Sequence, residues 1–330
     1  MRRLTFLVIF LSVAYSIYWF VGHRAVESAT QTMITEARQD GWQISYTDLN
    51  TTGFPSRFDT TATDITVSPI NQQWTWQAPF LQVFALSYQP NRVIAAFPNE
   101  QIVEIAGQTI AVSNSSLRAS GAVAARTDLA FDNATIEGDA LSIASDLGWE
   151  ISIARAIAAM RMQTGAENRY DAFFELGDLS LPREVGLQID PNGQLGTDVS
   201  KFVIDSAITF DRPLDRHVLE GGAAAAQMTN VTLRNVTLEW GPVVIRAQGG
   251  VEIDRQGIPD GRITFRSQQW RDMIDILVGA GVIDADIAPT VTTIASSMVA
   301  GDGSLEMPVV FAGGMMSLGP LPIGPAPRLR

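Results

Sequence analysis

Apolar and polar residues alternate along most of the chain from Trp42 onward, and this period of two constrains the fold more than any other feature of the sequence. Successive side chains of a strand point to opposite faces, so such alternation is typical of strands with one buried face. The clearest segments are 83–88, 102–105, 109–113, 149–153, 170–176 and 231–240. Short turns are predicted between strands at Asp146–Gly148, Asp190–Gly193, Gly249–Gly250 and Asp254–Gly257. Closely spaced turns leave no room for crossover helices, so we expect a mainly β fold: a long curved antiparallel sheet, or a sandwich or groove.

One stretch near the C-terminus has a helical period instead. Trp270, Met273, Ile274, Leu277 and Val278 form one stripe, and a second helix is predicted from Asp286 to Ala300 with Pro289 in its first turn. We expect a helical hairpin at about 268–300 within a β-rich body that covers residues 42–330. Such a hairpin would cover one face or one open end of the sheet.

The N-terminal segment 1–24 is predicted to be a transmembrane anchor. Leu4–Val21 is an apolar run without charge, and at 1.5 Å per residue it is about 27 Å long, close to the hydrocarbon thickness of a bilayer. Arg2 and Arg3 favour a cytosolic N-terminus, which places the body outside the cytosol. A cleaved signal peptide is the alternative, but it would need a shorter apolar region and a cleavage site of small residues.

A helical stalk is predicted after the anchor, at residues 25–41. Val26, Ala29, Met33 and Ala37 recur at helical spacing, and Gly41 is suited to end a helix in left-handed geometry. This segment is expected to pack as a spacer against the body.

Charge and composition exclude several classes of function. The chain has 23 Lys and Arg against 35 Asp and Glu, a net charge of −12. A surface of this sign repels phosphate backbones, so nucleic acid is not expected as a partner. The chain has no cysteine, which excludes thiol catalysis, disulfides and Cys-based zinc sites.

Candidate catalytic and metal-binding groups are sparse. The two histidines are His23, at the membrane edge, and His217, in a polar turn; neither is accompanied by the partners of a triad or a metal site. The acid pairs Glu175 with Asp178 and Asp284 with Asp286 are more typical of a solvated face or a helix cap than of acid–base catalysis. We therefore predict no catalytic residues, no cofactor and no metal, and a protein that is not an enzyme.

An apolar constellation is the remaining candidate site. Six aromatic residues fall within about two hairpins, close to Phe54 and Phe58: Trp74, Trp76, Phe80, Phe84, Tyr88 and Phe97. Ordinary core is the simpler interpretation, because sheets bury aromatics at alternating positions. The sharper hypothesis is an apolar groove on one sheet face that accepts lipid acyl chains.

Two passages resemble domain-of-unknown-function family 2125, found in Gram-negative bacteria. The first combines Gly53-Phe-Pro-Ser-Arg-Phe-Asp59 with the segment Trp76–Pro90, and the second runs from Val251 through the two helices to the segment 318–325. The resemblance implies a single-pass protein of the bacterial inner membrane with its C-terminal body in the periplasm. In architecture it is also similar to AsmA-like proteins, whose curved sheets can form grooves for lipid.

Two functional hypotheses follow. The first is a non-enzymatic anchored protein that holds or transfers lipid in envelope or outer-membrane biogenesis. The alternative is a scaffold that binds envelope proteins through a sheet edge or through the helical hairpin.

Overall fold

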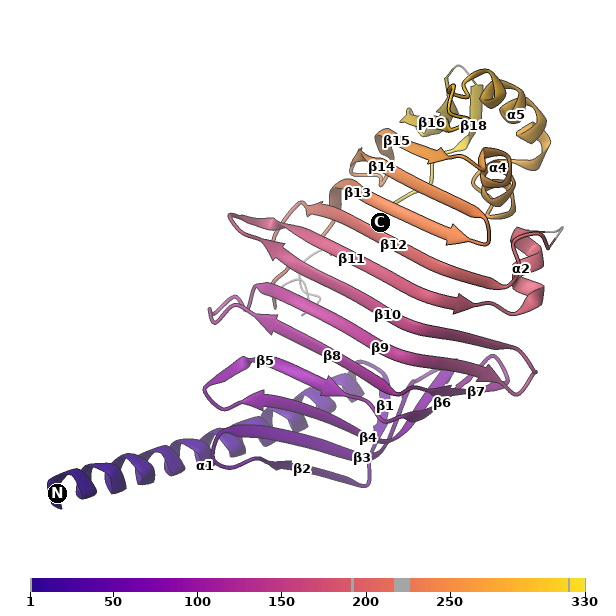
Figure 1. The fold of residues 1–330 in the computed structure, drawn as a ribbon. Coiled ribbons are helices and arrows are strands. Elements are labelled where there is room, and N and C mark those ends of the chain that lie inside the picture. The colour runs from indigo at the N-terminus through magenta and orange to yellow at the C-terminus, as the bar shows by residue number, and fades with distance from the viewer. Residues whose placement is uncertain (1, 191–192, 217–225, 320, 330) are drawn as a thin grey trace. The chain divides into compact units, whose positions relative to one another are not determined.

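The computed structural model describes residues 2–190, 193–216, 226–319 and 321–329 (Figure 1). The fold is mainly β and its strand pairs are antiparallel, as the alternation predicts. The chain forms two compact units, which we call the N-terminal unit (residues 1–123 and 136–149) and the C-terminal unit (residues 124–135 and 150–330). It passes between them three times, at 123/124, at 135/136 within strand β9 (Phe131–Ser145), and at 149/150.

The N-terminal unit contains one long helix, α1 (Arg2–Gln39), followed by eight strands. These are β1 (Trp42–Ser45), β2 (Asp48–Thr52), β3 (Arg57–Pro69), β4 (Trp74–Leu86), β5 (Gln89–Ala96), β6 (Glu100–Ile105), β7 (Gln108–Ser113) and β8 (Ser116–Val123). The first part of β3 pairs with β2 and its last part with β1, while β4 pairs first with β6 and then with β5. The change falls at Asp64, whose positive φ of 49° interrupts the alternation of buried side chains along β3.

Helix α1 runs without a break through the predicted anchor and stalk. Its residues are exposed as far as Tyr15, and from there one stripe is buried or half-buried. The stripe consists of Ser16, Trp19, Gly22, His23, Val26, Glu27, Thr30, Ile34 and Ala37. Ala29 and Met33 are exposed, because the strands meet the helix face that carries Thr30 and Ile34.

The C-terminal unit is a meander in which each strand pairs with the next along the chain. Its strands are β10 (Glu150–Gln163), β11 (Ala166–Ser180), β12 (Asp198–Phe210), β13 (Met228–Trp240), β14 (Val243–Ile253), β15 (Pro259–Ser267), β16 (Leu305–Ala312), β17 (Met315–Leu318) and β18 (Leu321–Pro325). Helix α2 (Arg183–Ile189) follows β11 and was not predicted. Helices α4 (Trp270–Gly279) and α5 (Ala288–Ser297) lie between β15 and β16, with a short 3-10 turn (Ala285–Ile287) before α5.

The turn predicted at Gly249–Gly250 is wrong, because both glycines lie inside β14. Gly249 has a φ of 149°, and a Cβ atom there would lie 2.2 Å from the carbonyl oxygen of Arg262 on β15. The glycine therefore allows a close approach of two strands rather than a reversal of the chain.

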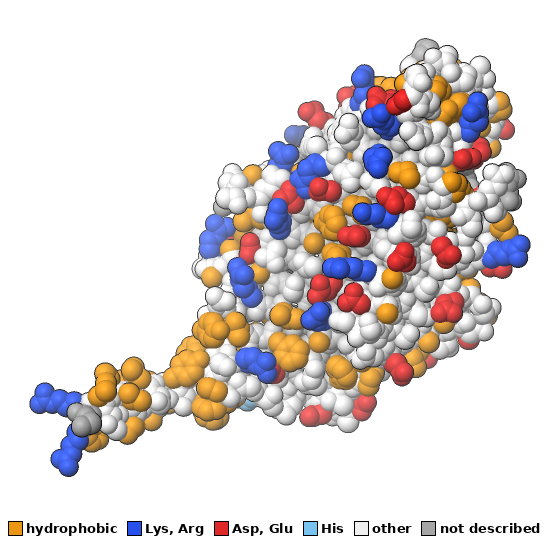
Figure 2. All heavy atoms as spheres, in the orientation of Figure 1, with side chains coloured by type: hydrophobic (Ala, Val, Ile, Leu, Met, Phe, Trp, Pro, Cys, Tyr) orange, Lys and Arg blue, Asp and Glu red, His pale blue; other side chains and the backbone are white. Residues whose placement is uncertain are grey.

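The two faces of the C-terminal unit's sheet differ in chemistry. Figure 2 shows one of them, where Lys and Arg side chains alternate with Asp and Glu over the strands from β10 to β14. The main core lies on the opposite face, where residues of β14 and β16 pack with α4 and α5. Ile245, Met273, Val291 and Met307 are 7%, 0%, 0% and 1% exposed, which identifies a closed core.

Candidate functional site

The apolar face of the C-terminal unit continues beyond this core onto strands β10 to β13. Direct cross-strand partners form one row, in which Ala158 faces Phe174, Phe174 faces Ile204, and Ile204 faces Val236. Opposite residues of an antiparallel pair point to the same side of the sheet, so these four side chains share one face. The next row has Met160 and Ala172, and the row on the other side has Ala156, Leu176 and Phe202. We call this region the open face.

The side chains of the open face are only partly covered. Met160, Phe174, Ile204 and Val236 are half-buried, and Ala158 is exposed. The helix α4 packs over β14 and β15 instead, and α2 packs against α4. Within the described residues, the open face is therefore an apolar surface that lacks the helical cover of the neighbouring strands.

One end of the open face is closed by the segments 124–135 and 211–216. Tyr170 is fully buried there, with its ring 5.7 Å from the rings of Phe131 and Phe210. Its hydroxyl accepts a hydrogen bond of 2.8 Å from the backbone N–H of Leu214. At the other end Phe202 and Leu238 pack against the main core. The open face is thus bounded along the strands by ordered, closed packing.

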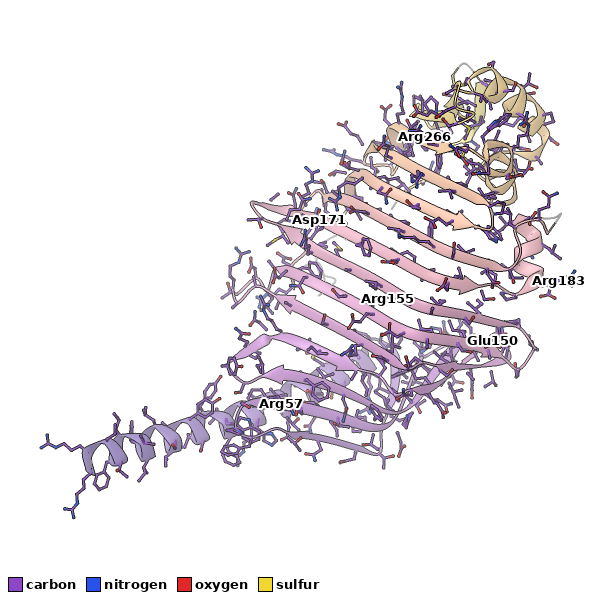
Figure 3. All side chains as sticks on the ribbon, viewed as in Figure 1. Arg57, Glu150, Arg155, Asp171, Arg183 and Arg266 are labelled. Carbon is purple, nitrogen blue, oxygen red and sulfur yellow. The ribbon has the colours of Figure 1, made fainter. Side chains whose placement is uncertain are left out.

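On the opposite side of the same strands lies a network of charges. A bulge in β13 leaves Arg234 without a direct strand partner, and its guanidinium binds Asp171 on β11, labelled in Figure 3, and Asp205 on β12. Hydrogen bonds from Gln163, and then from Arg234 and Arg161, lower the pKa of Asp171 to about 2. The network shows that the charges of these strands gather on one face.

In the N-terminal unit the notable site is the contact of α1 with two loops. Tyr18 donates a hydrogen bond of 2.5 Å to the carbonyl oxygen of Ser87, and the Tyr15 hydroxyl lies 3.1 Å from the hydroxyl of Ser87. The indole N–H of Trp19 donates to the carbonyl oxygen of Arg57, at 2.9 Å; Arg57 is labelled in Figure 3. Trp19 is 5% exposed, so the helix is firmly docked at this point.

Apolar packing reinforces the same contact. The ring of Trp19 lies 5.3 Å from the ring of Phe54 and 5.9 Å from that of Phe58, and Phe20 also contacts Phe54 at 5.9 Å. A Cβ atom at Gly22 would lie 2.7 Å from the ring of Phe58, so the helix can approach this closely only with glycine there. We call this set of contacts the helix dock.

The six aromatic residues of the predicted groove do not form a single cluster. Trp76 and Phe97 are in ring contact at 6.3 Å, but Trp74 contacts Trp42 instead. Phe84 lies under the guanidinium of Arg57, at 5.9 Å, and Phe80 is half-buried opposite Thr63. Tyr88 is 62% exposed beside the helix dock. A separate hollow of about 550 Å³ lies near them, where Ile65, Ala78, Pro79, Ile102 and Val112 are among the lining residues.

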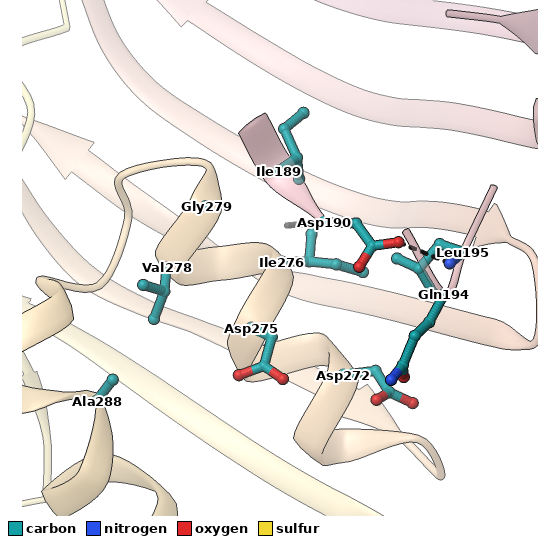
Figure 4. A pocket seen from close by; sticks show the side chains of 10 residues that line it. All are labelled: Ile189, Asp190, Gln194, Leu195, Asp272, Asp275, Ile276, Val278, Gly279 and Ala288. Carbon is teal, nitrogen blue, oxygen red and sulfur yellow. Dashed lines mark hydrogen bonds between the residues drawn. The ribbon is translucent and has the colours of Figure 1, made fainter. Parts of the chain in front are cut away.

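A smaller pocket of about 250 Å³ lies between α2 and α4 (Figure 4). Asp190, Asp272 and Asp275 are among the residues that line it. The backbone N–H of Leu195 donates a hydrogen bond of 2.7 Å to Asp190. Partial desolvation, and then the charges of Asp272 and Asp190, raise the pKa of Asp275. Within the described residues, no group of three or more His, Cys, Asp or Glu side chains has the geometry to hold a metal ion.

The other residues considered for chemistry have structural surroundings. Asp284 accepts a hydrogen bond of 3.0 Å from the N–H of Asp286, which caps the 3-10 turn. His23 stacks on Trp19 with ring centroids 5.0 Å apart, and its Nε2 lies 3.4 Å from Glu27. His217 lies outside the described residues.

Sequence reasoning missed the open face as a site. Its strands were recognised from their alternation, but the same alternation continues in β14 and β16, where the face is covered. The available signal was the position of the helical stripe at 270–278, which follows β15 in the chain and covers the strands nearest to it.

Comparisons with known proteins agree with the resemblance in sequence. The family described as "Uncharacterized protein conserved in bacteria (DUF2125)" matches residues 19–327. Searches of the curated proteins and of the solved structures found no match. The matched segment begins at Trp19 of the helix dock and includes the open face, and the chain belongs to this family of bacterial proteins.

Proposed function

We propose that this protein is a non-enzymatic, membrane-anchored protein of the cell envelope that holds lipid acyl chains on its open face. The single observation that carries the proposal is the half-buried row Phe174, Ile204 and Val236 on strands whose charges lie on the other face. Uncharged apolar surface of this kind is suited to hydrocarbon chains, which need no catalytic group for binding.

The N-terminal helix supports a location next to lipid. Helix α1 is long and apolar enough to cross a membrane, and Arg2 and Arg3 stand at its N-terminal end. Basic residues on the short N-terminal side favour a cytosolic N-terminus. The body then lies in the periplasm, where it can receive acyl chains from the inner membrane during envelope or outer-membrane biogenesis.

The test is photo-crosslinking in membranes that contain a phospholipid with a photoreactive acyl chain. We expect adducts on the open face, at Met160, Phe174 and Ile204, in addition to those on α1. Adducts confined to α1 would refute lipid binding by the body. A protein partner crosslinked to the same residues in cells, without lipid adducts, would favour the scaffold hypothesis instead.

Two adjacent phenylalanines provide a matched pair of variants. Phe174 lies on the open face, while Phe173 is opposite Asp205 on the charged face, and both are half-buried. We expect Phe174→Asp to reduce lipid adducts on the open face and Phe173→Asp to leave them unchanged. Circular dichroism and thermal unfolding of both variants would show that each remains folded, and equal lipid labelling in the two would contradict the proposal.

A further inference from the structure

The helix dock joins the apolar run of α1 to two loops of the N-terminal unit. Tyr15, Tyr18 and Trp19 belong to the apolar run Leu4–Val21, yet they bind Ser87 and Arg57 of the body. The loop 53–56 between β2 and β3, with the first residue of β3, and the turn 87–88 between β4 and β5 therefore lie beside the apolar run, and not beyond its end.

The lengths make this overlap substantial. Tyr15 precedes Val21 by six residues, which is about 9 Å along a helix axis. The part of the run before Tyr15, Leu4–Ala14, is only about 17 Å long, whereas a hydrocarbon core is roughly 30 Å thick. If α1 crosses a bilayer, the two loops must reach into the membrane interface or below it.

The side chains at these loops suit that environment. Phe54 is 53% exposed and Tyr88 is 62% exposed, although both are large aromatics. Phe20 of α1, which contacts Phe54, is 57% exposed as well. The guanidinium of Arg57 is paired with Asp59 at 2.6 Å, so its charge is compensated. Tyr and Trp side chains, which have an apolar body and a polar end, favour the interface between lipid and water. Phe side chains are found on the buried, apolar face of segments that lie in this interface.

We propose that Phe54 and Tyr88 form a second membrane contact, which seats the N-terminal unit in the outer interface of the bilayer that α1 spans. The occupant of this surface is the lipid of that membrane. This contact goes beyond lipid binding by the open face and does not depend on it; it rests only on α1 crossing the membrane.

The absence of cysteine from the sequence allows a direct test on the full-length chain. Single variants Phe54→Cys and Tyr88→Cys are labelled with an environment-sensitive fluorophore and reconstituted into phosphatidylcholine–phosphatidylglycerol vesicles. Quenching by lipids with a nitroxide near the headgroup is then measured. We expect strong quenching at both positions, several-fold greater than at Asn71→Cys. Asn71 is an exposed control beside Ile70, whose N–H binds the carbonyl oxygen of Gly41, about 30 Å along α1 from Trp19.

Two further variants make the result decisive. Leu11→Cys, in the exposed part of the run, reports insertion of α1. Strong quenching at position 11 together with weak quenching at 54 and 88, equal to that at 71, would overturn the second contact. Weak quenching at position 11 would overturn its premise. Gly22→Leu should force α1 away from Phe58 and lower the quenching at 54 and 88, with position 11 unchanged.

Discussion

The apolar face of the C-terminal unit has two halves: a covered half on β14 to β16, over which helices pack, and an open half, which is the open face on β10 to β13. Both halves follow the same alternation of apolar and polar residues, but only the first is covered by helices. On β14, Ile245 is 7% exposed beneath the packing of α4, whereas Ile204 on β12 is half-buried in the middle row of the open face. Both side chains belong to the same face of one meander. Periodicity therefore decides which face is apolar, and the position of the helices decides whether that face is a core or a surface.

This difference has a physical consequence for the two halves. Side chains in the covered half make contacts on all sides, and their burial stabilises the unit. Side chains in the open half retain contact with solvent, so part of the free energy of burying them remains available to a ligand. The covered half is expected to be sensitive to mutation and the open half tolerant.

The largest effect is expected at Gly249, in the covered half. A Cβ atom would collide with the carbonyl oxygen of Arg262, and the φ of 149° is strained for any other residue. We expect Gly249→Ala to lower the free energy of unfolding by about 3 kcal/mol or more. Gly250→Ala is the control, because its Cβ would lie 3.4 Å from the nearest atom, and it should change stability by less than about 1 kcal/mol. Equal effects in denaturant unfolding would contradict the close approach of β14 and β15.

The second effect compares one residue type in the two halves. Ile245→Ala should cost about 3 kcal/mol, because a closed core cannot collapse around the cavity. Ile204→Ala should cost about 1 kcal/mol, since its side chain is already partly solvated in the folded state. Urea unfolding of the two variants measures the difference. A loss at Ile204 as large as that at Ile245 would mean that the open face is covered in solution.

The sequence predicted the fold class for a clear reason. Each strand carries its own period-two signal, so the mainly β architecture, the apolar N-terminal helix and the helical stripe of Trp270, Met273 and Ile274 could be recognised locally. Gly249 was misread because a glycine pair has the same local pattern in a turn and in a strand that approaches its neighbour closely. The partner atom, the carbonyl oxygen of Arg262, is distant in sequence.

The candidate site was harder to predict than the fold. The groove hypothesis placed six aromatics on one surface because they are close in the sequence. Asp64 on β3 has a positive φ and lies where burial changes phase. Trp76 packs against a small core cluster that contains Ile65, whereas Phe84 lies under Arg57. Such a local change of backbone conformation leaves no clear signal in composition. The openness of the face around Phe174 depends on which strands α4 reaches, which is a long-range property.

A smaller effect on stability is expected from the charge network on the opposite side of the strands that carry the open face. Arg234 bridges Asp171 and Asp205, whereas Arg161 binds Asp171 alone and is 74% exposed. Arg234→Ala should lower stability by about 0.5–1 kcal/mol, and Arg161→Ala by less. The folded-state pKa of Asp171, about 2, lies below its ordinary value of 3.8, so this stabilisation is present above about pH 4 and is lost as pH falls toward 2. Thermal unfolding between pH 2 and 7 measures both variants, and a pH dependence unchanged in Arg234→Ala would contradict the network.

The smallest effect on stability is expected at Asp275 on α4, one of the helices that pack over the covered half. Its charge destabilises the folded state, whereas the charge of Asp171 stabilises it. The pKa of Asp275 is raised by partial desolvation and by Asp272 and Asp190, so the folded protein binds this proton more tightly than the unfolded chain does. Stability therefore falls as pH rises through the unfolded pKa of about 4, and it stays lower above the folded pKa. Asp275→Asn removes the charge and should raise the melting temperature slightly at pH 7 and leave it unchanged at low pH. Asp171→Asn, which removes a favourable charge, should lower it at pH 7. If both variants changed the melting temperature at pH 7 in the same direction, the carboxylates of Asp275 and Asp171 would not differ in electrostatic environment.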